Sequence, residues 1–188
     1  MFSLVLLFCG CGTATTPADA IAEIKKLGGK VSLNKSGEVI QVILSGQKIT
    51  DAGLEHLKSL TSLMILDLKD TQVTDAGLKH LNGLTSLTVL FLDNTQITDA
   101  GLVHLKGLTS LNALFLDNTQ VTDAGLEHLQ GLTSLNTLFL RDTKITDAGL
   151  EDLKCLTKLE VMVLRRTQVT DVGLSELKAA LPKCKVVK

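Results

Sequence analysis

The amino-acid sequence predicts an α/β solenoid, in which similar units of one strand and one short helix stack along a single axis. The pentapeptide Thr-Asp-Ala-Gly-Leu begins at residues 50, 74, 98, 122 and 146, and a near copy, Thr-Asp-Val-Gly-Leu, begins at residue 170. The spacing is 24 residues each time, with no insertion or deletion. A fixed period in this range is typical of stacked repeats. Because such stacks mostly present an extended surface to a partner, binding is favoured over catalysis.

The first eleven residues resemble a targeting segment. Residues 1–8 (MFSLVLLF) are apolar. This run is too short to cross a bilayer, which takes roughly 20 residues, but it suits the apolar region of a secretory signal. The string Phe8-Cys9-Gly10-Cys11 resembles a bacterial lipobox, and by that resemblance Cys11 accepts the lipid. We therefore expect an exported or membrane-anchored protein of the cell envelope. The alternative is an apolar tail on a cytoplasmic protein.

Residues 12–38 are expected to form a spacer and an N-terminal cap. Thr16 is the predicted N-cap of a helix that Gly28-Gly29 ends. Residues 30–33 and 38–44 then follow as two strands joined by a short turn. Such a cap shields the apolar end of the first repeat, as an open stack requires.

Residues 39–188 carry the repeats and end in a C-terminal capping strand over residues 181–187. The pattern Leu-x-x-Leu-x-Leu begins at residues 63, 87, 111 and 135, and recurs at residue 159 with Met at the fourth position; its Leu-x-Leu end has the period of a strand. The later spacing of Leu78, Leu81 and Leu84 is helical. Each repeat therefore supplies one strand and one short helix.

The helix of each repeat begins at the recurrent Thr-Asp pair. Thr74 is a good N-cap, and Asp75 is favourably placed at the positive end of the helix. Gly83 and Gly107 fit helix C-termini. A residue pair that appears six times is better explained by this structural role than by catalysis.

The combined pattern L-x-x-L-x-L-x-x-T-x-I-T-D-A-G-L-x-x-L resembles leucine-rich repeats over about residues 39–188. It is closest to the bacterial group with Thr-Asp-Ala-Gly-Leu units and is similar to the cysteine-containing repeats of F-box proteins. The resemblance implies a parallel β-sheet on the concave face and short helices on the convex face. The usual ladder Asn or Cys is replaced by threonine, at Thr71, Thr95, Thr119, Thr143 and Thr167. We expect each threonine hydroxyl to bond the turn backbone.

Position five of the strand unit gathers the aromatic residues. Positions one, four and six are expected to point inward, and positions three, five, seven and eight to face the concave surface. Along the stack, position five is Ile43, Asp67, Phe91, Phe115, Phe139 and Val163. Because neighbouring strands lie about 4.8 Å apart, the three Phe form a continuous apolar stripe of the kind that tends to mark interaction sites. The alternatives are that the rings stiffen the sheet by stacking, or that the repeats are alike because they were copied.

Charged residues flank this stripe, with acid toward one end and base toward the other. The acids are Asp67, Asp70, Asp93 and Asp117, and the bases are Arg141, Arg165 and Arg166. Such an arrangement would orient a partner, and Arg beside Phe is enriched at binding hot spots. The alternative is that these are ordinary solvating charges. Because four Asp offset three Arg, a protein partner is favoured over nucleic acid.

Nothing in the remaining sequence indicates a catalytic, metal or cofactor site. There is no Gly-rich phosphate loop, G-x-S-x-G or H-E-x-x-H motif. A convex column of histidines, which we interpret as copies of an exposed helical position, comprises His56, His80, His104 and His128. One His per repeat is poorly placed to close a shell around a metal ion. The formal net charge of −1 gives no net attraction to nucleic acid or an anionic membrane.

Two cysteines lie within the repeats. Cys184 occupies the position of a first strand leucine and is expected to be buried, whereas Cys155 replaces a Gly or Ser of other repeats. A disulfide between them is one option in an exported protein, and two free thiols are the other.

The sequence thus predicts a non-catalytic, monomeric protein-interaction module without cofactors. The predicted contacts are Phe91, Phe115, Phe139, Asp93, Asp117, Arg141 and Arg165, with Cys11 as the lipid site. Two alternatives remain: a cytoplasmic substrate adaptor like the F-box repeats, and a carbohydrate or cell-wall binder on the same face. The absence of Trp and Tyr argues against the carbohydrate binder.

Overall fold

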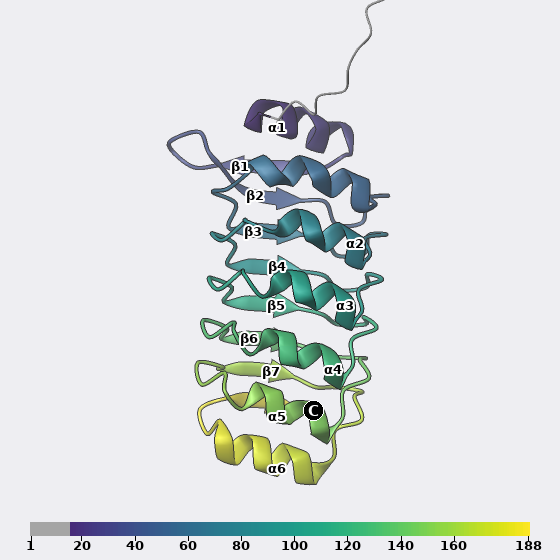
Figure 1. The fold of residues 1–188 in the computed structure, drawn as a ribbon, viewed down its shortest axis with the longest axis vertical. Coiled ribbons are helices and arrows are strands. Elements are labelled where there is room, and N and C mark those ends of the chain that lie inside the picture. The colour runs from purple at the N-terminus through teal and green to yellow at the C-terminus, as the bar shows by residue number, and fades with distance from the viewer. Residues whose placement is uncertain (1–15) are drawn as a thin grey trace, which may run out of the picture.

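The computed structural model of the protein describes residues 16–188. They form one stack of strand-and-helix units, running from α1 at one end to α6 at the other, with the helices of the repeats on one face of the sheet (Figure 1). The first 15 residues, with the predicted lipid site Cys11, lie outside the described part. Among the described residues, no helix is both long and apolar enough to cross a membrane.

The sheet has eight strands in chain order, and it is parallel from β2 onward. The strands are β1 (Lys30–Leu33), β2 (Val39–Ile43), β3 (Ile65–Asp67), β4 (Val89–Phe91), β5 (Ala113–Phe115), β6 (Thr137–Phe139), β7 (Val161–Val163) and β8 (Lys185–Val187). From β3 to β8, each strand pairs with the preceding one at residues 24 positions earlier. Because side chains alternate between the two faces, this register aligns equivalent positions of successive repeats in one column.

The helices of the central repeats are shorter than the leucine spacing predicts. The α-helices are α1 (Pro17–Lys26), α2 (Asp75–Leu78), α3 (Asp99–Leu102), α4 (Asp123–Leu126), α5 (Asp147–Leu153) and α6 (Asp171–Ala180). Tighter 3₁₀ turns cover Asp51–Ser59, Lys79–Leu81, Val103–Leu105 and Glu127–Leu129. Leu84 therefore lies beyond its helix, although it is fully buried. Gly83 takes a left-handed φ of 91° after the helix, whereas Gly107 does not.

The helix and the two strands expected before the first repeat are present, with the helix at Pro17–Lys26. Thr16 Oγ1 accepts a hydrogen bond from the Asp19 backbone N–H, and the Asp19 carboxylate accepts one from the Thr16 backbone N–H, which completes a capping box on α1. Ile24 of this helix is fully buried. The antiparallel pair of β1 and β2 then connects the cap to the first repeat.

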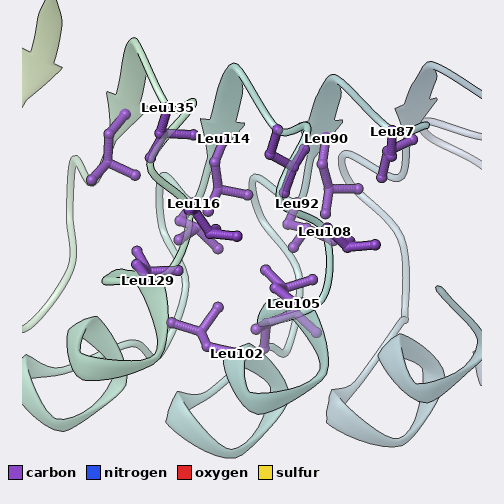
Figure 2. Packing of buried hydrophobic residues seen from close by; sticks show 14 of the residues in the cluster. Leu87, Leu90, Leu92, Leu102, Leu105, Leu108, Leu114, Leu116, Leu129 and Leu135 are labelled. Atoms are coloured by element: carbon purple, nitrogen blue, oxygen red, sulfur yellow. The ribbon is translucent and has the colours of Figure 1, made fainter. Parts of the chain in front are cut away.

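The core is a series of nearly identical leucine layers between the strands and the helices (Figure 2). Leu90 and Leu92 from the strand side meet Leu102 and Leu105 from the helix side, and all four are fully buried. Fully burying such a side chain contributes about 1.5–3 kcal/mol. The layers supply cohesion along the whole stack, but leucines this alike do not by themselves set the alignment of one repeat on the next.

The threonines that replace the usual ladder residue bond the turn backbone, as predicted. Thr71 Oγ1 donates to the Leu68 carbonyl at 2.6 Å, and Thr95 Oγ1 donates to the Leu92 carbonyl at 2.5 Å. Thr119, Thr143 and Thr167 make the same bond in their repeats. These hydroxyls satisfy buried carbonyl groups where the chain leaves each strand.

A pair of hydrogen bonds between an aspartate and a threonine joins each repeat to the next. At the centre of the stack, Asp99 Oδ1 accepts from the Thr122 backbone N–H, and Asp99 Oδ2 accepts from Thr122 Oγ1, both at 2.7 Å. We call this arrangement the Asp–Thr bridge. It recurs at Asp51–Thr74, Asp75–Thr98, Asp123–Thr146 and Asp147–Thr170. The sequence predicted only that the Asp favours the helix start.

The bridge also explains the glycine of the pentapeptide. A Cβ atom on Gly125 would collide with Asp99 Oδ1, and the equivalent glycines of the other bridged repeats meet the preceding Asp in the same way. Gly125 does not have a left-handed φ, so it is required for space and not for backbone freedom. Each pentapeptide residue except alanine thus has a defined task. Thr binds the preceding Asp, Asp binds the following Thr, Gly leaves room, and Leu fills the core.

Candidate functional site

The continuous register of the strands brings Phe91, Phe115 and Phe139 side by side, as predicted. Phe91 pairs with Phe115 between β4 and β5, and Phe115 pairs with Phe139 between β5 and β6. The first two rings are stacked, with centroids 4.4 Å apart, and the next two are tilted at 4.8 Å. We call these three residues the aromatic column. Each side chain is half-buried, because the rings cover one another while still facing solvent.

The aromatic column lines a shallow hollow of about 320 Å³ on the sheet face. The lining consists of Asp67, Lys69, Phe91, Asp93, Asn94, Phe115, Asp117, Phe139 and Arg141. Six of the seven predicted contact residues are therefore gathered in one place. The seventh, Arg165, follows Arg141 at the same position of the next repeat and lies beyond the lining. Sequence reasoning missed Lys69 and Asn94, although both occupy concave-facing positions of their repeats.

The two central carboxylates of the hollow are held by the protein itself. Asp93 is only 6% exposed, and its Oδ1 accepts a hydrogen bond from the Asp117 backbone N–H at 3.1 Å. Burial raises the pKa of the Asp93 carboxyl, and the hydrogen bond from Asp117 opposes that rise. Asp117 Oδ1 accepts from the Arg141 backbone N–H at 2.8 Å, while Asp117 Oδ2 lies 3.4 Å from Arg141 Nε. Little of this negative charge is left for a partner.

The turn beside the hollow has an unusual backbone conformation that the sequence analysis did not find. Position eight of five repeats has a left-handed φ between 53° and 58°, at Asp70, Asn94, Asn118, Asp142 and Arg166. Asn and Asp tolerate this region better than other residues with a Cβ, so their recurrence at one position was the available signal. Arg166 breaks the pattern, because its side chain gives no such tolerance.

The predicted separation of acid from base is incomplete. Lys69 lies among the acids, and Asp142 lies among the arginines, where its Oδ2 is 3.5 Å from Arg141 Nε and its Oδ1 is 3.6 Å from an Arg166 guanidinium nitrogen. Within residues 16–188, the guanidinium of Arg165 has no ion-pair partner. The arginine end thus keeps one guanidinium group, that of Arg165, without a carboxylate partner among the described residues.

The histidine column is less exposed than predicted. His80 is buried at 8% exposure, and the other three histidines are partly buried. The Nδ1 atoms of His56 and His80 are buried, with no hydrogen-bond partner among the described residues. The short helices of successive repeats pack closely enough to cover these rings. Over residues 16–188, no group of three or more His, Cys, Asp or Glu side chains is placed to hold a metal ion.

Both repeat cysteines carry free thiols. Cys184 is buried, as predicted, and Cys155 is exposed. Burial raises the pKa of the Cys184 thiol, which keeps it protonated and unreactive at neutral pH.

Comparison with known proteins agrees with the fold and the repeat pattern. Residues 61–121 and residues 131–154 each match a family described as leucine-rich repeat. An internalin from Listeria monocytogenes has a similar structure, with a TM-score of 0.61 and 22% identity over 94% of this chain, and this chain covers 59% of its length. Internalin C2 from the same organism aligns with a TM-score of 0.58 and 25% identity over 92% of both chains. No protein with a curated description matches the chain.

These findings identify the class of protein. The described residues have the fold of leucine-rich repeat solenoids, with the strands of a mainly parallel sheet on one face and short helices on the other, and residues 61–121 and 131–154 match leucine-rich repeat models. Repeat domains of this class serve as protein-interaction modules and are generally non-catalytic.

The burial of His80 predicts that acid destabilises the fold. Burial lowers the pKa of the His80 imidazole, and the charges of Lys58 and Lys79 lower it further, against smaller opposing effects of Glu55 and Asp51. As the pH falls below about 6.5, the unfolded chain therefore binds the proton first, and stability is lost. We expect the urea-unfolding free energy of the wild type to fall more between pH 7 and pH 5 than that of His80→Met. If the unfolding free energy fell equally with pH in the wild type and in His80→Met, the loss of stability in acid could not be assigned to His80.

Proposed function

We propose that the protein is a non-catalytic interaction module that binds a protein partner on the concave face of its sheet. The observation that carries the proposal is the hollow in which the aromatic column meets the charged residues beside it. Half-buried aromatic rings beside arginine are the residue types enriched at protein-binding hot spots. The rigid sheet beneath holds the rings in place, so a partner would bind without first ordering them.

The stacking of the rings favours a protein over a carbohydrate. Sugar rings bind best against the free face of an aromatic ring, whereas Phe115 has a neighbouring ring on each side. Solvent therefore meets the edges of the aromatic column more than its faces. Aliphatic and aromatic side chains of a protein pack well against such edges.

The aromatic column predicts the outcome of a binding experiment. In a crosslinking pull-down from extract of the source cells, the triple variant Phe91→Ala/Phe115→Ala/Phe139→Ala should capture the wild-type partner roughly 10-fold less or worse. The captured protein is then purified, and its binding to the wild type and to the triple variant is measured separately. A matched control, Val103→Ala/Val172→Ala, removes exposed apolar side chains from the helices and should bind as the wild type does. Circular dichroism and thermal unfolding check that all variants fold.

Equal capture by the wild type and the triple variant would contradict the proposal. It would also assign the aromatic column to sheet stiffening, where each cross-strand pair contributes about 0.2–1 kcal/mol. Loss of binding in the convex control instead would place the interface on the other face.

We further propose that the protein is exported and anchored in the cell envelope by a lipid on Cys11. The support is the apolar run of residues 1–8 and the lipobox-like string that follows. When the full chain is expressed in a bacterial host fed an alkyne fatty acid, the wild type should carry the label and enter the membrane fraction. Cys11→Ser should lose both properties, while Cys155→Ser, which removes an exposed thiol, should keep them. An unlabelled, cytoplasmic wild type would contradict the proposal.

A further inference from the structure

The charges around the hollow differ in how much is left for a partner. Asp93 is buried against the Asp117 backbone, and both Asp117 oxygens face Arg141. Asp70 Oδ1 accepts a hydrogen bond from Asn94 Nδ2 at 2.6 Å. The two carboxylates at the centre of the hollow, Asp93 and Asp117, are thus engaged within the protein, while Asp67 at its edge accepts a hydrogen bond from the Lys69 backbone N–H.

The arginine end is the opposite case. Arg165 is exposed and, within residues 16–188, has no carboxylate partner. Arg166 beside it is 78% exposed at its side chain and shares the Asp142 carboxylate with Arg141. The guanidinium groups of Arg141 and Arg166 therefore share the carboxylates of Asp117 and Asp142, and that of Arg165 is left without one in the described part of the chain. The charge that a partner meets at this end is positive.

Arg166 also departs from the conformation that suits its residue type. Its φ of 56° is left-handed, and the other four repeats place Asp or Asn there. Strained residues of this kind often cluster at functional sites. An arginine at this position, next to the free Arg165, adds a second positive charge where Asp or Asn would fit the backbone better.

We propose that the hollow binds an extended acidic segment of a partner protein, with apolar side chains on the aromatic column and a carboxylate at Arg165 and Arg166. This inference rests on the proposed function and specifies the partner's chemistry. The strands from β4 to β7 span about 14 Å, which about five extended residues cover. A short linear segment is therefore long enough to reach both parts of the site.

The other occupants fit less well. A basic segment would need free carboxylates beside the aromatic column, and the two at its centre, Asp93 and Asp117, are engaged within the protein. A single-stranded nucleic acid would stack its bases on open ring faces, which Phe115 does not offer, and its phosphates would pass the Asp93 and Asp117 carboxylates.

The test is selection of a random peptide library, displayed on phage, on the immobilised full chain. The peptides are about twelve residues long, more than the site requires. We expect the wild type to enrich peptides that place an Asp or Glu within a few residues of apolar side chains. Arg165→Glu/Arg166→Glu should lose these peptides and select Lys or Arg in place of the acid. Lys79→Glu/Lys106→Glu, which makes the same change of net charge in a short helix and just after another, should select as the wild type does.

The selected peptide then gives an affinity by fluorescence anisotropy. Arg165→Ala/Arg166→Ala should weaken its binding roughly 10-fold, and the effect should shrink as salt is added. Arg166→Asn should raise the melting temperature by roughly 2–4 °C, because Asn tolerates the left-handed region, while it weakens peptide binding.

The outcomes separate this inference from the proposed function. Peptides that depend on the three Phe but show neutral or basic residues would overturn the acidic-segment inference and leave the interaction module intact. Failure to enrich any Phe-dependent peptide, or binding of single-stranded oligonucleotides at this face in a parallel anisotropy assay, would count against both.

Discussion

The Asp–Thr bridge is the interaction on which the rest of the structure depends. Leucine layers hold the stack together, but nearly identical layers favour no single alignment of neighbouring repeats. The carboxylate of each Asp accepts two hydrogen bonds from one Thr in the following repeat, and the glycine two residues after the next Asp leaves space for it. For Asp147, whose partner is Thr170, these bonds lower the carboxyl pKa. A directional contact, repeated every 24 residues, thus fixes how far and at what angle each unit follows the last.

The candidate site follows from this fixed alignment. With no slip between strands, Phe91, Phe115 and Phe139 must stack, and the residues two positions later must form a charged column beside them. Opposite charges in neighbouring repeats then form contacts, and Asp117 pairs with Arg141 of the next repeat. The charged column ends in Arg141 and Arg165, because the last repeats carry arginine where the central repeats carry aspartate. A uniform scaffold therefore presents a non-uniform surface.

The sequence allowed the fold and most of the candidate site to be predicted, because a constant period of 24 residues places equivalent residues of successive repeats in the same column. It placed the aromatic column correctly and assigned Thr16 and the ladder threonines their hydrogen bonds. It did not reveal the partner of each Asp carboxylate, since a charge at a helix start explained the residue equally well. The burial of His80 was missed because it depends on how closely the short helices pack. Which charges pair with each other and which stay free, as Arg165 does, depends on side-chain geometry that a periodic pattern does not contain.

The most direct test of the central claim compares Asp99→Ala with Asp171→Ala in urea unfolding. Both aspartates lie in the first turn of a helix, so any effect of the helix dipole is shared. Asp99 bridges to Thr122, whereas the Asp171 side chain is 94% exposed and contacts Lys188. We expect Asp99→Ala to lose about 2 kcal/mol or more of unfolding free energy, and Asp171→Ala to change it by less than about 0.5 kcal/mol. Equal losses in the two variants would show that these aspartates act only as helix starts.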